Sequence, residues 1–508
     1  MYPSFRYRET QKEMGSFNGV SSVLLLSWLL VLLLCTEECL SRIPSLLGRP
    51  RGRYGRTHRH PSLSPSTLKD FQTLYYDQTL DHFNYRPESY TTFRQKYVVN
   101  SKYWNGSNNS SPIFVYIVGE WDLTEGDYTN IVADIAPQYQ ALLVYIEHRY
   151  YGESLPFGSR KEAYRNASNF GYLSIDQALA DLAEIITYLR KNYSAEHCPV
   201  IVYGGSYAGM LASWFRLKYP HIAMGAWASS APILDFSDIN PRDEYNTIVT
   251  KDFREASEDC YNTIKESWAI IDKIGSHPKG LKYLSKKFKT CSRLNTSEDL
   301  RDFLCYTFEE AAQYDAPPDY PVNTICNAID GLPPGTEFLT RIFAGINATL
   351  SLGCYNTTPE TDASLKMDPW TWQACTELMG SNGQSTNVTM FPQNYRPYIS
   401  ADQCMSLFGI PERPHWLVTE FGGQDIKLIL KRFGSNIIFS NGLRDPYSVG
   451  GVLEDISDSI VAIKTTQGSH CLDMYSLSPN DPDWLASQKK KILHIIEGWM
   501  KEYHAVWT

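Results

Sequence analysis

The stretch "PVIVYGGSYAGMLASWF", Pro199 to Phe215, places an apolar run, a glycine-rich turn and a helical pattern in direct succession. Ser206 lies in the turn, with Gly204 two residues before it and Ala208 two residues after it. Small residues are needed at both positions because the helix of such a turn packs closely on the strand. Ala208 is one methyl group larger than the usual glycine, and we expect the turn to be intact. Ser206 is then either a nucleophile or only a structural residue of a tight turn.

Further apolar runs, rich in β-branched and aromatic residues, predict buried strands of a parallel sheet. They are "PIFVYIVG" (112–119), "ALLVYIEH" (141–148), "NIIFSNGLRDPY" (436–447) and "SIVAIKTTQGSH" (459–470). A helical pattern occupies 174–193, and an amphipathic helix from Trp484 carries Leu485, Ile492, Ile496 and Trp499 on one side. Strand–helix–strand alternation predicts an α/β layer architecture.

The sheet pattern is interrupted between residues 236 and 415, where helical patterns are broken by proline and glycine. Seven of the eleven cysteines lie between 260 and 404. We therefore predict a disulfide-stapled, mostly helical insertion over 236–415, flanked by a first sheet part at 71–235 and a second at 416–508.

A serine nucleophile needs a base and an orienting acid, which in this architecture follow it in the order acid, then histidine. Of the histidines near the C-terminus, His470 directly follows a predicted strand, whereas His494 and His504 lie on or near the last helix. The acid should also follow a strand, which favours Asp445; Asp235, after "SSAPIL", is the alternative. The spacing predicts a Ser206–Asp445–His470 triad.

An oxyanion hole would combine the backbone N–H of Tyr207 with one near Gly119 and Glu120, after the 112–119 strand. The motif "EHRYYGES" (147–154) contains His148 and Arg149, which resemble catalytic residues. A buried ion pair or a turn is the favoured interpretation for both, and His82 in "LDHFN" is interpreted in the same way.

The N-terminus predicts export. The apolar run from Val23 to Leu34 indicates a signal peptide over 1–41, although an uncleaved signal anchor is the alternative. Arginines, prolines and serines over 42–70 predict a disordered basic arm or propeptide, or else a basic surface patch. Nine glycosylation sequons support export: Asn105, Asn108, Asn109, Asn166, Asn192, Asn295, Asn347, Asn356 and Asn387.

Charge and cysteine usage narrow the class of protein further. The net charge of −9 and the lack of a basic stripe or nucleic-acid motif argue against nucleic-acid binding. Clustered cysteines in an exported chain predict disulfides, with at least one free thiol and buried free Cys198 as a natural case. No Cys/His spacing suggests zinc, and we expect no metal, no cofactor and no membrane span once the signal is removed.

Six motifs together resemble the serine peptidase family of prolyl carboxypeptidase and dipeptidyl peptidase II, especially the Pro-X carboxypeptidase-like proteins of plants. They are "QTLDHFNYRPESYTTFRQKY", "VYIEHRYYGES", "GGSYAGM", "LKYPHIAMGAWASSAPI", "IIFSNGLRDPYSVGG" and "GSHCLDM". The resemblance covers roughly residues 75 to 500. It implies an α/β-hydrolase domain with a helical cap, and the same Ser206–Asp445–His470 triad.

The resemblance also implies finer features of the site. Met210 and Tyr447 match positions that line a proline pocket, and the implied disulfides are Cys260–Cys326, Cys291–Cys354 and Cys375–Cys404. The chain departs from the family pattern at Ala208, where glycine is usual, and at two positions near the base. Cys471 and Tyr475 stand where many members carry a histidine and an arginine.

The resemblance implies a secreted, lysosomal or vacuolar serine exopeptidase that hydrolyses bonds next to proline near a chain end. Its substrates would be proline-containing peptides, cleaved as by a Pro-X carboxypeptidase. Alternatives are a dipeptidyl aminopeptidase acting after X-Pro, another ester or amide hydrolase, and a non-catalytic binding protein. Four acidic residues near the oxyanion loop could bind an amine terminus: Glu120, Asp122, Glu125 and Asp127. Monomer and homodimer both remain open.

Overall fold

The computed structural model describes residues 65–106, 111–234, 244–357, 368–378, 388–392, 401–411, 413 and 415–507. The chain divides into two compact units, residues 1–43 and 44–508, and all that follows concerns the second. The predicted signal peptide and most of the predicted arm lie outside the described residues. Residues 65–70 of that arm contain the short helix α3 (Pro65–Leu68), and Asp70 pairs with Lys102 at 2.8 Å.

An eight-stranded sheet forms the centre of the fold, in the order β1-β2-β4-β3-β5-β6-β7-β8. β1 and β2 pair antiparallel, β2 runs antiparallel to β4, and the remaining neighbours are parallel. The bounds are β1 Gln72–Thr79, β2 Thr92–Asn100, β3 Ile113–Ile117, β4 Leu142–Ile146, β5 Val200–Gly205, β6 Gly225–Ser229, β7 Ile437–Gly442 and β8 Ile460–Thr465. The five predicted strands are confirmed as β3, β4, β5, β7 and β8.

Two parts of the sheet differ from the sequence-based expectation. The strand suspected at "SSAPIL" is β6, which ends at Ser229, so most of that motif follows the strand. β1 and β2 were not anticipated, because neither QTLYYDQT nor TFRQKYVVN shows a continuous apolar run like those of the predicted strands.

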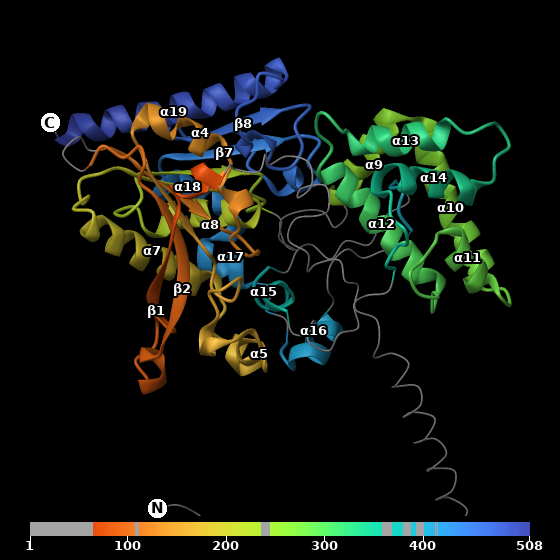
Figure 1. The fold of residues 1–508 in the computed structure, drawn as a ribbon, viewed down its shortest axis with the longest axis horizontal. Coiled ribbons are helices and arrows are strands. Elements are labelled where there is room, and N and C mark those ends of the chain that lie inside the picture. Colours follow the sequence, from red (N-terminus) through yellow and green to blue (C-terminus); the bar gives the residue numbers. More distant parts are fainter. Residues whose placement is uncertain are drawn as a thin grey trace, which may run out of the picture. The chain divides into compact units, whose positions relative to one another are not determined.

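Helices cover both faces of the sheet, with α19 on one side and α7 and α8 on the other (Figure 1). The helices of this part are α4 Ile131–Tyr139, α5 Arg160–Ala163, α6 Ala167–Phe170, α7 Ile175–Asn192, α8 Tyr207–Lys218, α17 Trp416–Phe421, α18 Ile426–Phe433 and α19 Asp483–Trp507. The four apolar residues predicted to share one side of α19 are all buried. Within the described ranges, no helix has the length and apolar character that a membrane span requires.

The insertion between β6 and β7 contains a group of helices with its own buried core (Figure 1). They are α9 Glu244–Ala256, α10 Glu258–Gly275, α11 Gly280–Lys287, α12 Ser297–Gln313, α13 Pro321–Asp330 and α14 Phe338–Leu350. Disulfides Cys260–Cys326 and Cys291–Cys354 cross-link this group, and they are pairs that the family resemblance implies. The α/β-hydrolase fold with a large helical insertion is thereby confirmed, while the exact domain boundaries stay predictions.

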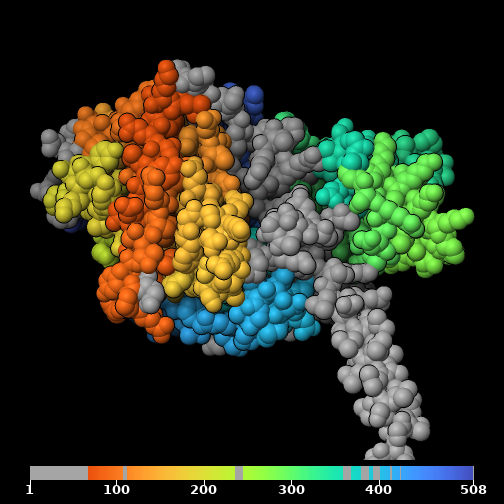
Figure 2. Space-filling model, turned by 60° about the horizontal axis from the view of Figure 1, so that its bottom comes forward, coloured from red at the N-terminus to blue at the C-terminus, as the bar shows by residue number. Residues whose placement is uncertain are grey.

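The last helices of the insertion, α15 (Pro369–Thr376) and α16 (Ala401–Phe408), belong to a different cluster. The third disulfide, Cys375–Cys404, joins them. Their side chains pack with Tyr150 and Phe170, from the region after β4, and not with the core of α9–α14. Figure 2 shows the light-blue residues around α16 directly against the gold segment that contains α5 and α6. This part of the insertion therefore packs against the sheet domain.

Arg444, two residues after the end of β7 and next to the predicted acid, connects the helical group to the sheet. Its guanidinium donates to Asp315 at 2.8 Å and lies 3.7 Å from Asp252 of α9. Asp252 is fully buried, and both its oxygens lack a hydrogen-bond donor within the described residues. Burial raises the pKa of Asp252 to about 8, although the Arg444 charge opposes the rise.

Stability should therefore depend on pH through Asp252. Between its ordinary pKa near 3.8 and its folded pKa of about 8, the folded state binds the extra proton. The unfolding free energy must then fall as pH rises across this window, by up to about 1.4 kcal/mol per unit. We predict that Asp252→Asn removes this loss. Measured by urea unfolding, the unfolding free energy of the variant should therefore rise relative to that of the wild type between pH 5 and 8. Glu255→Gln, an exposed partner of Arg444, is the control and should shift stability by less than about 1 kcal/mol; equal pH slopes for Asp252→Asn and wild type would contradict the assignment.

Candidate active site

Ser206 stands alone between the end of β5 and the first residue of α8. Its backbone has φ 58° and ψ −129°, a conformation that non-glycine residues rarely adopt and that costs on the order of 1–3 kcal/mol. Its N–H donates to the carbonyl of Ser229 at 2.8 Å, and its own carbonyl accepts from Met210 at 3.0 Å. The residue is half-buried, so its hydroxyl is held at a sharp, partly accessible turn.

Glycines make the close approach of helix to strand possible. A Cβ at Gly204 would lie 2.7 Å from the backbone of Ala208, and one at Gly209 would lie 2.8 Å from the carbonyl of Ser229. Ala208 is completely buried. Its methyl group fits because Gly204, opposite it, has no side chain, which is how the turn tolerates this departure from the family pattern.

The predicted acid and base meet in the structure. His470 Nδ1 lies 2.7 Å from Asp445 Oδ2, and both side chains are buried. Asp445 Oδ1 accepts from the N–H of Tyr447 at 3.0 Å, which fixes the carboxylate. Because an ionised carboxylate can only accept, Nδ1 carries the proton and Nε2 is left as the basic nitrogen.

Two opposing effects act on the pKa of His470. Burial is the largest single effect and lowers it, but the charges of Asp445 and Cys471 and their hydrogen bonds to the ring together hold the pKa well above its ordinary value near 6.5. The imidazolium form is therefore stabilised, as a base that must accept a proton requires.

The loops that carry the predicted nucleophile and the predicted base lie side by side at the end of the parallel strands. The N–H of Cys471 donates to Ser230 Oγ at 2.9 Å, next to Ser229, whose carbonyl binds Ser206. A Cβ on Gly205 would lie 2.7 Å from Cys471 Sγ. Among the described residues, no hydrogen bond joins Ser206 Oγ to the His470 ring. Such contacts are often long in the absence of substrate.

The buried carboxyl group of Asp473 connects the loop after β8 to the end of β6. Asp473 accepts from Ser229 Oγ at 2.6 Å and is almost fully buried. Burial raises its pKa above the ordinary value. It thereby links the loop after His470 to the strand end that holds the Ser206 turn.

The loop after β3, where the second oxyanion donor is predicted, is anchored by the buried carboxylate of Glu147. Its Oε1 accepts from Leu123 at 2.9 Å, and its Oε2 accepts from Glu153 and Ser154. Tyr207 is the first residue of α8, and the first N–H groups of a helix have no partner within it. Burial chiefly raises the pKa of the Tyr207 phenol, and the charges of Glu377 and of half-buried Glu120 add to the rise.

The end of α12, in the helical insertion, contacts the predicted base His470. The N–H of His470 donates to the carbonyl of Gln313 at 3.0 Å, at the end of α12. The ring of Tyr447 lies 5.1 Å from that of His470 and 5.0 Å from Tyr245 of α9. Met210 is buried in the first turn of α8. The positions of Met210 and Tyr447 close to the nucleophile and the base are compatible with a pocket, and their role in one stays a prediction.

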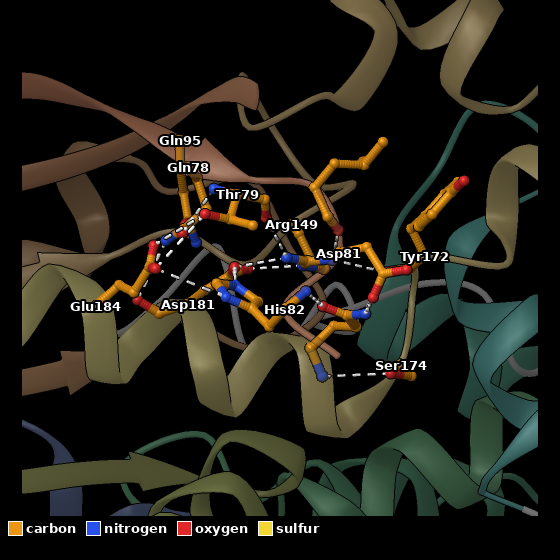
Figure 3. Close-up of polar contacts among 12 residues, drawn as sticks. Gln78, Thr79, Asp81, His82, Gln95, Arg149, Tyr172, Ser174, Asp181 and Glu184 are labelled. Carbon is orange, nitrogen blue, oxygen red and sulfur yellow. Dashed lines mark hydrogen bonds and ion pairs between the residues drawn. The ribbon is translucent and has the colours of Figure 1, made fainter. Parts of the chain in front are cut away.

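The other residues singled out by sequence have structural partners. Arg149 is fully buried and makes two bonds to Asp181, at 2.7 Å from Nε and 2.5 Å from Nη2. His82 Nε2 lies 2.8 Å from the same carboxylate, and Figure 3 shows both side chains directed at Asp181. The structural interpretation of Arg149 and His82 is confirmed. The alternative acid, Asp235, lies outside the described residues.

The acidic residues considered for binding an amine are only partly available. Asp127 is buried and accepts from Trp121 Nε1 and from the backbone and hydroxyl of Thr124. Asp122 accepts from the N–H of Gly152. Glu120 and Glu125 are half-buried and exposed, respectively. The most buried carboxylate of this set, that of Asp127, is thus occupied within its own loop.

The cysteines and sequons agree with an exported chain. The free cysteines within the described residues are Cys198, Cys305 and Cys471. Five sequon asparagines are exposed: Asn105, Asn166, Asn192, Asn295 and Asn356. Asn347 is half-buried and accepts from the Tyr355 hydroxyl at 3.2 Å. Asn108, Asn109 and Asn387 lie outside the described residues, and glycosylation at all nine stays a prediction.

Comparisons with known proteins define the class. Residues 78–492 match the family described as Serine carboxypeptidase S28, and the chain belongs to this family of serine peptidases. The Lysosomal Pro-X carboxypeptidases of Homo sapiens and Pongo abelii are each 35% identical to it, covering 88% of this chain and 91% of the relative. The Prolyl carboxy peptidase like protein 5 of Caenorhabditis elegans is 30% identical, and the match covers 93% of this chain and 97% of the relative.

The geometry of the turn leads to a prediction. Gly204→Ala should destabilise the protein by about 1–3 kcal/mol, because the new methyl group meets the Ala208 backbone and side chain. Adding Ala208→Gly should recover part of this loss, since it removes one of the contacts. Gly498→Ala, where nothing lies within 4 Å, is the matched control. Urea unfolding of the four proteins is the measurement, and full stability of Gly204→Ala would show that the turn is looser than described.

Proposed function

We propose that this serine peptidase is an exopeptidase that hydrolyses bonds adjacent to proline near a chain end, through Ser206, Asp445 and His470. The observation that carries the proposal is the buried 2.7 Å contact between Asp445 and His470, on a loop that packs against the strained Ser206 turn. An acid, a base and a sharply turned serine at neighbouring strand ends are what acyl transfer requires.

The chemistry follows from these positions. Ser206 Oγ attacks the carbonyl carbon of the scissile bond while its proton passes to His470 Nε2. Asp445 stabilises the imidazolium, and backbone N–H groups at Tyr207 and near Gly119 bind the oxyanion. The C–N bond breaks as His470 returns the proton to the leaving nitrogen. Water then attacks the acyl-enzyme by the same proton route, releasing the acid and restoring Ser206.

Cleavage at the carboxyl end is the favoured form. Relatives that match most of this chain are named Lysosomal Pro-X carboxypeptidase. Of the acidic residues that could bind a free amine, Asp127 is already engaged within its loop. A dipeptidyl aminopeptidase acting after X-Pro is the second candidate, favoured only by Glu120 near Tyr207, and another ester or amide hydrolase is the third.

We also propose that the protein acts in the secretory pathway, in a lysosome, a vacuole or outside the cell. Three disulfides within the described residues require an oxidising compartment for folding. The relatives named lysosomal and the sequons support the same location.

The direct test uses peptides with an internal proline, followed by mass spectrometry. The wild type should shorten X-Pro-X peptides at the carboxyl end, and Ser206→Ala should lower the rate by about 10³-fold or more while the protein still folds and is secreted. Shortening from the amino end would select the aminopeptidase. Near-normal turnover by Ser206→Ala would remove Ser206 from the mechanism.

The acid assignment is tested by a pair of substitutions. Asp445→Asn should lower kcat by about 10⁴-fold, because an amide lets His470 adopt the wrong tautomer. Asp235→Asn, the alternative assignment, should cost far less. Both are measured as kcat at saturating peptide, and a larger loss in Asp235→Asn would show that the acid has been misassigned.

The raised pKa of His470 sets the acid limb of the activity. As pH falls through that pKa the base becomes protonated, so kcat/KM must fall. Cys471→His with Tyr475→Arg would place positive charge near the base, lower its pKa and move the limb to lower pH. Cys198→Ser, a buried free cysteine just before the start of β5 and so at the opposite end of that strand from Ser206, is the control and should leave the limb in place. A limb that stays fixed or moves upward in the double variant would show that these positions do not tune the base.

A further inference from the structure

The side chain of Tyr207, the residue after the proposed nucleophile, is held in a buried chain of hydrogen bonds. Its hydroxyl lies 3.1 Å from His148 Nε2 and 2.6 Å from Gln373 Nε2. His148 Nδ1 lies 2.8 Å from the carbonyl of Arg149, and Gln373 Oε1 accepts from Tyr151 at 2.7 Å. All four side chains are buried.

The donor and the acceptor at the Tyr207 hydroxyl are fixed by the carbonyl of Arg149, at one end of this series of hydrogen bonds. The Arg149 carbonyl can only accept, so His148 Nδ1 carries a proton and, in the neutral ring, Nε2 accepts. The Tyr207 hydroxyl must then donate to His148, which leaves its oxygen to accept from Gln373. Burial lowers the pKa of His148 to about 4, so the ring is neutral over most of the pH range. The Tyr207 hydroxyl therefore donates to His148 and accepts from Gln373, and the reverse assignment is excluded.

Three separate parts of the fold meet at this hydroxyl. Tyr207 begins α8, His148 follows β4, and Gln373 lies on α15 of the insertion. The disulfide Cys375–Cys404 fixes α15 two residues beyond Gln373. Arg149, next to His148, is itself locked by its two bonds to Asp181 (Figure 3). The phenol is therefore clamped by rigid partners.

We propose that this clamp makes the Tyr207 side chain, with His148 and Gln373, a positioning group for the oxyanion hole, an inference that rests on the proposed function. The same residue supplies the backbone N–H that faces the developing oxyanion, and it follows the strained backbone of Ser206. Fixing the phenol fixes the direction of that N–H. Oxyanion donors act only when they are aimed beforehand at the place where charge develops.

The test compares an inhibitor that forms the oxyanion with one that cannot. A short peptide ending in prolinal accepts Ser206 Oγ at its carbonyl carbon while the Ser206 proton passes to His470, so that the hemiacetal oxygen carries the negative charge of an oxyanion. The corresponding prolinol only binds. For the wild type we expect the aldehyde to bind at least about 10²-fold more tightly than the alcohol. In Tyr207→Phe the aldehyde affinity and kcat should fall by about 10-fold to 10²-fold, with KM and alcohol affinity nearly unchanged.

Two further variants separate positioning from loss of stability. Gln373→Leu keeps Tyr207 and should shift the same two quantities in the same direction, by less. Tyr203→Phe removes another buried phenol, on β5, whose hydroxyl lies 3.4 Å from Asn130 Oδ1, and should change neither aldehyde affinity nor kcat beyond about twofold. Equal loss of aldehyde and alcohol affinity in Tyr207→Phe, or no loss of either, would overturn the positioning role alone. A wild type that binds aldehyde and alcohol equally would instead overturn the proposed nucleophile, and the positioning role with it.

Discussion

The backbone of Ser206 is the constraint around which the rest of the site is organised. A serine at φ 58° and ψ −129° is unfavourable by itself, so the surrounding contacts must hold it. The bond to the Ser229 carbonyl, the missing side chains of Gly204 and Gly209, and the buried first turn of α8 do this. The strain is useful because it points a hydroxyl outward from the end of a fully buried strand.

The remaining parts of the site are attached to the same strand ends. Asp445 follows β7, His470 follows β8, and Cys471 and Asp473 bond to Ser230 and Ser229 at the end of β6. Arg444 extends this arrangement into the helical insertion, while α12 covers the base. The base therefore lies in a buried setting where interactions with Asp445 and Cys471 raise its pKa against the effect of burial. Cys471 and Tyr475 stand where the family pattern has a histidine and an arginine.

Much of the fold could be predicted because its signals are local. Buried parallel strands appear as continuous apolar runs, and the order of serine, aspartate and histidine can be followed from one strand end to the next. β1 was missed because only one of its eight residues is buried, so it shows no apolar run. The place of α15 and α16 was missed because it depends on packing against Tyr150 and Phe170, some 200 residues earlier in the chain. The clamp on Tyr207 joins residues 166 positions apart, and no local pattern reveals such a contact.

The central claim is that Ser206 is activated by His470 and Asp445. The most direct measurement is to react the folded protein with a fluorophosphonate and map the modified residue by peptide mass spectrometry. The account predicts a single phosphonylated residue, Ser206, with labelling strongly slowed in His470→Ala. Labelling at another serine, or labelling of Ser206 at an unchanged rate in His470→Ala, would contradict it.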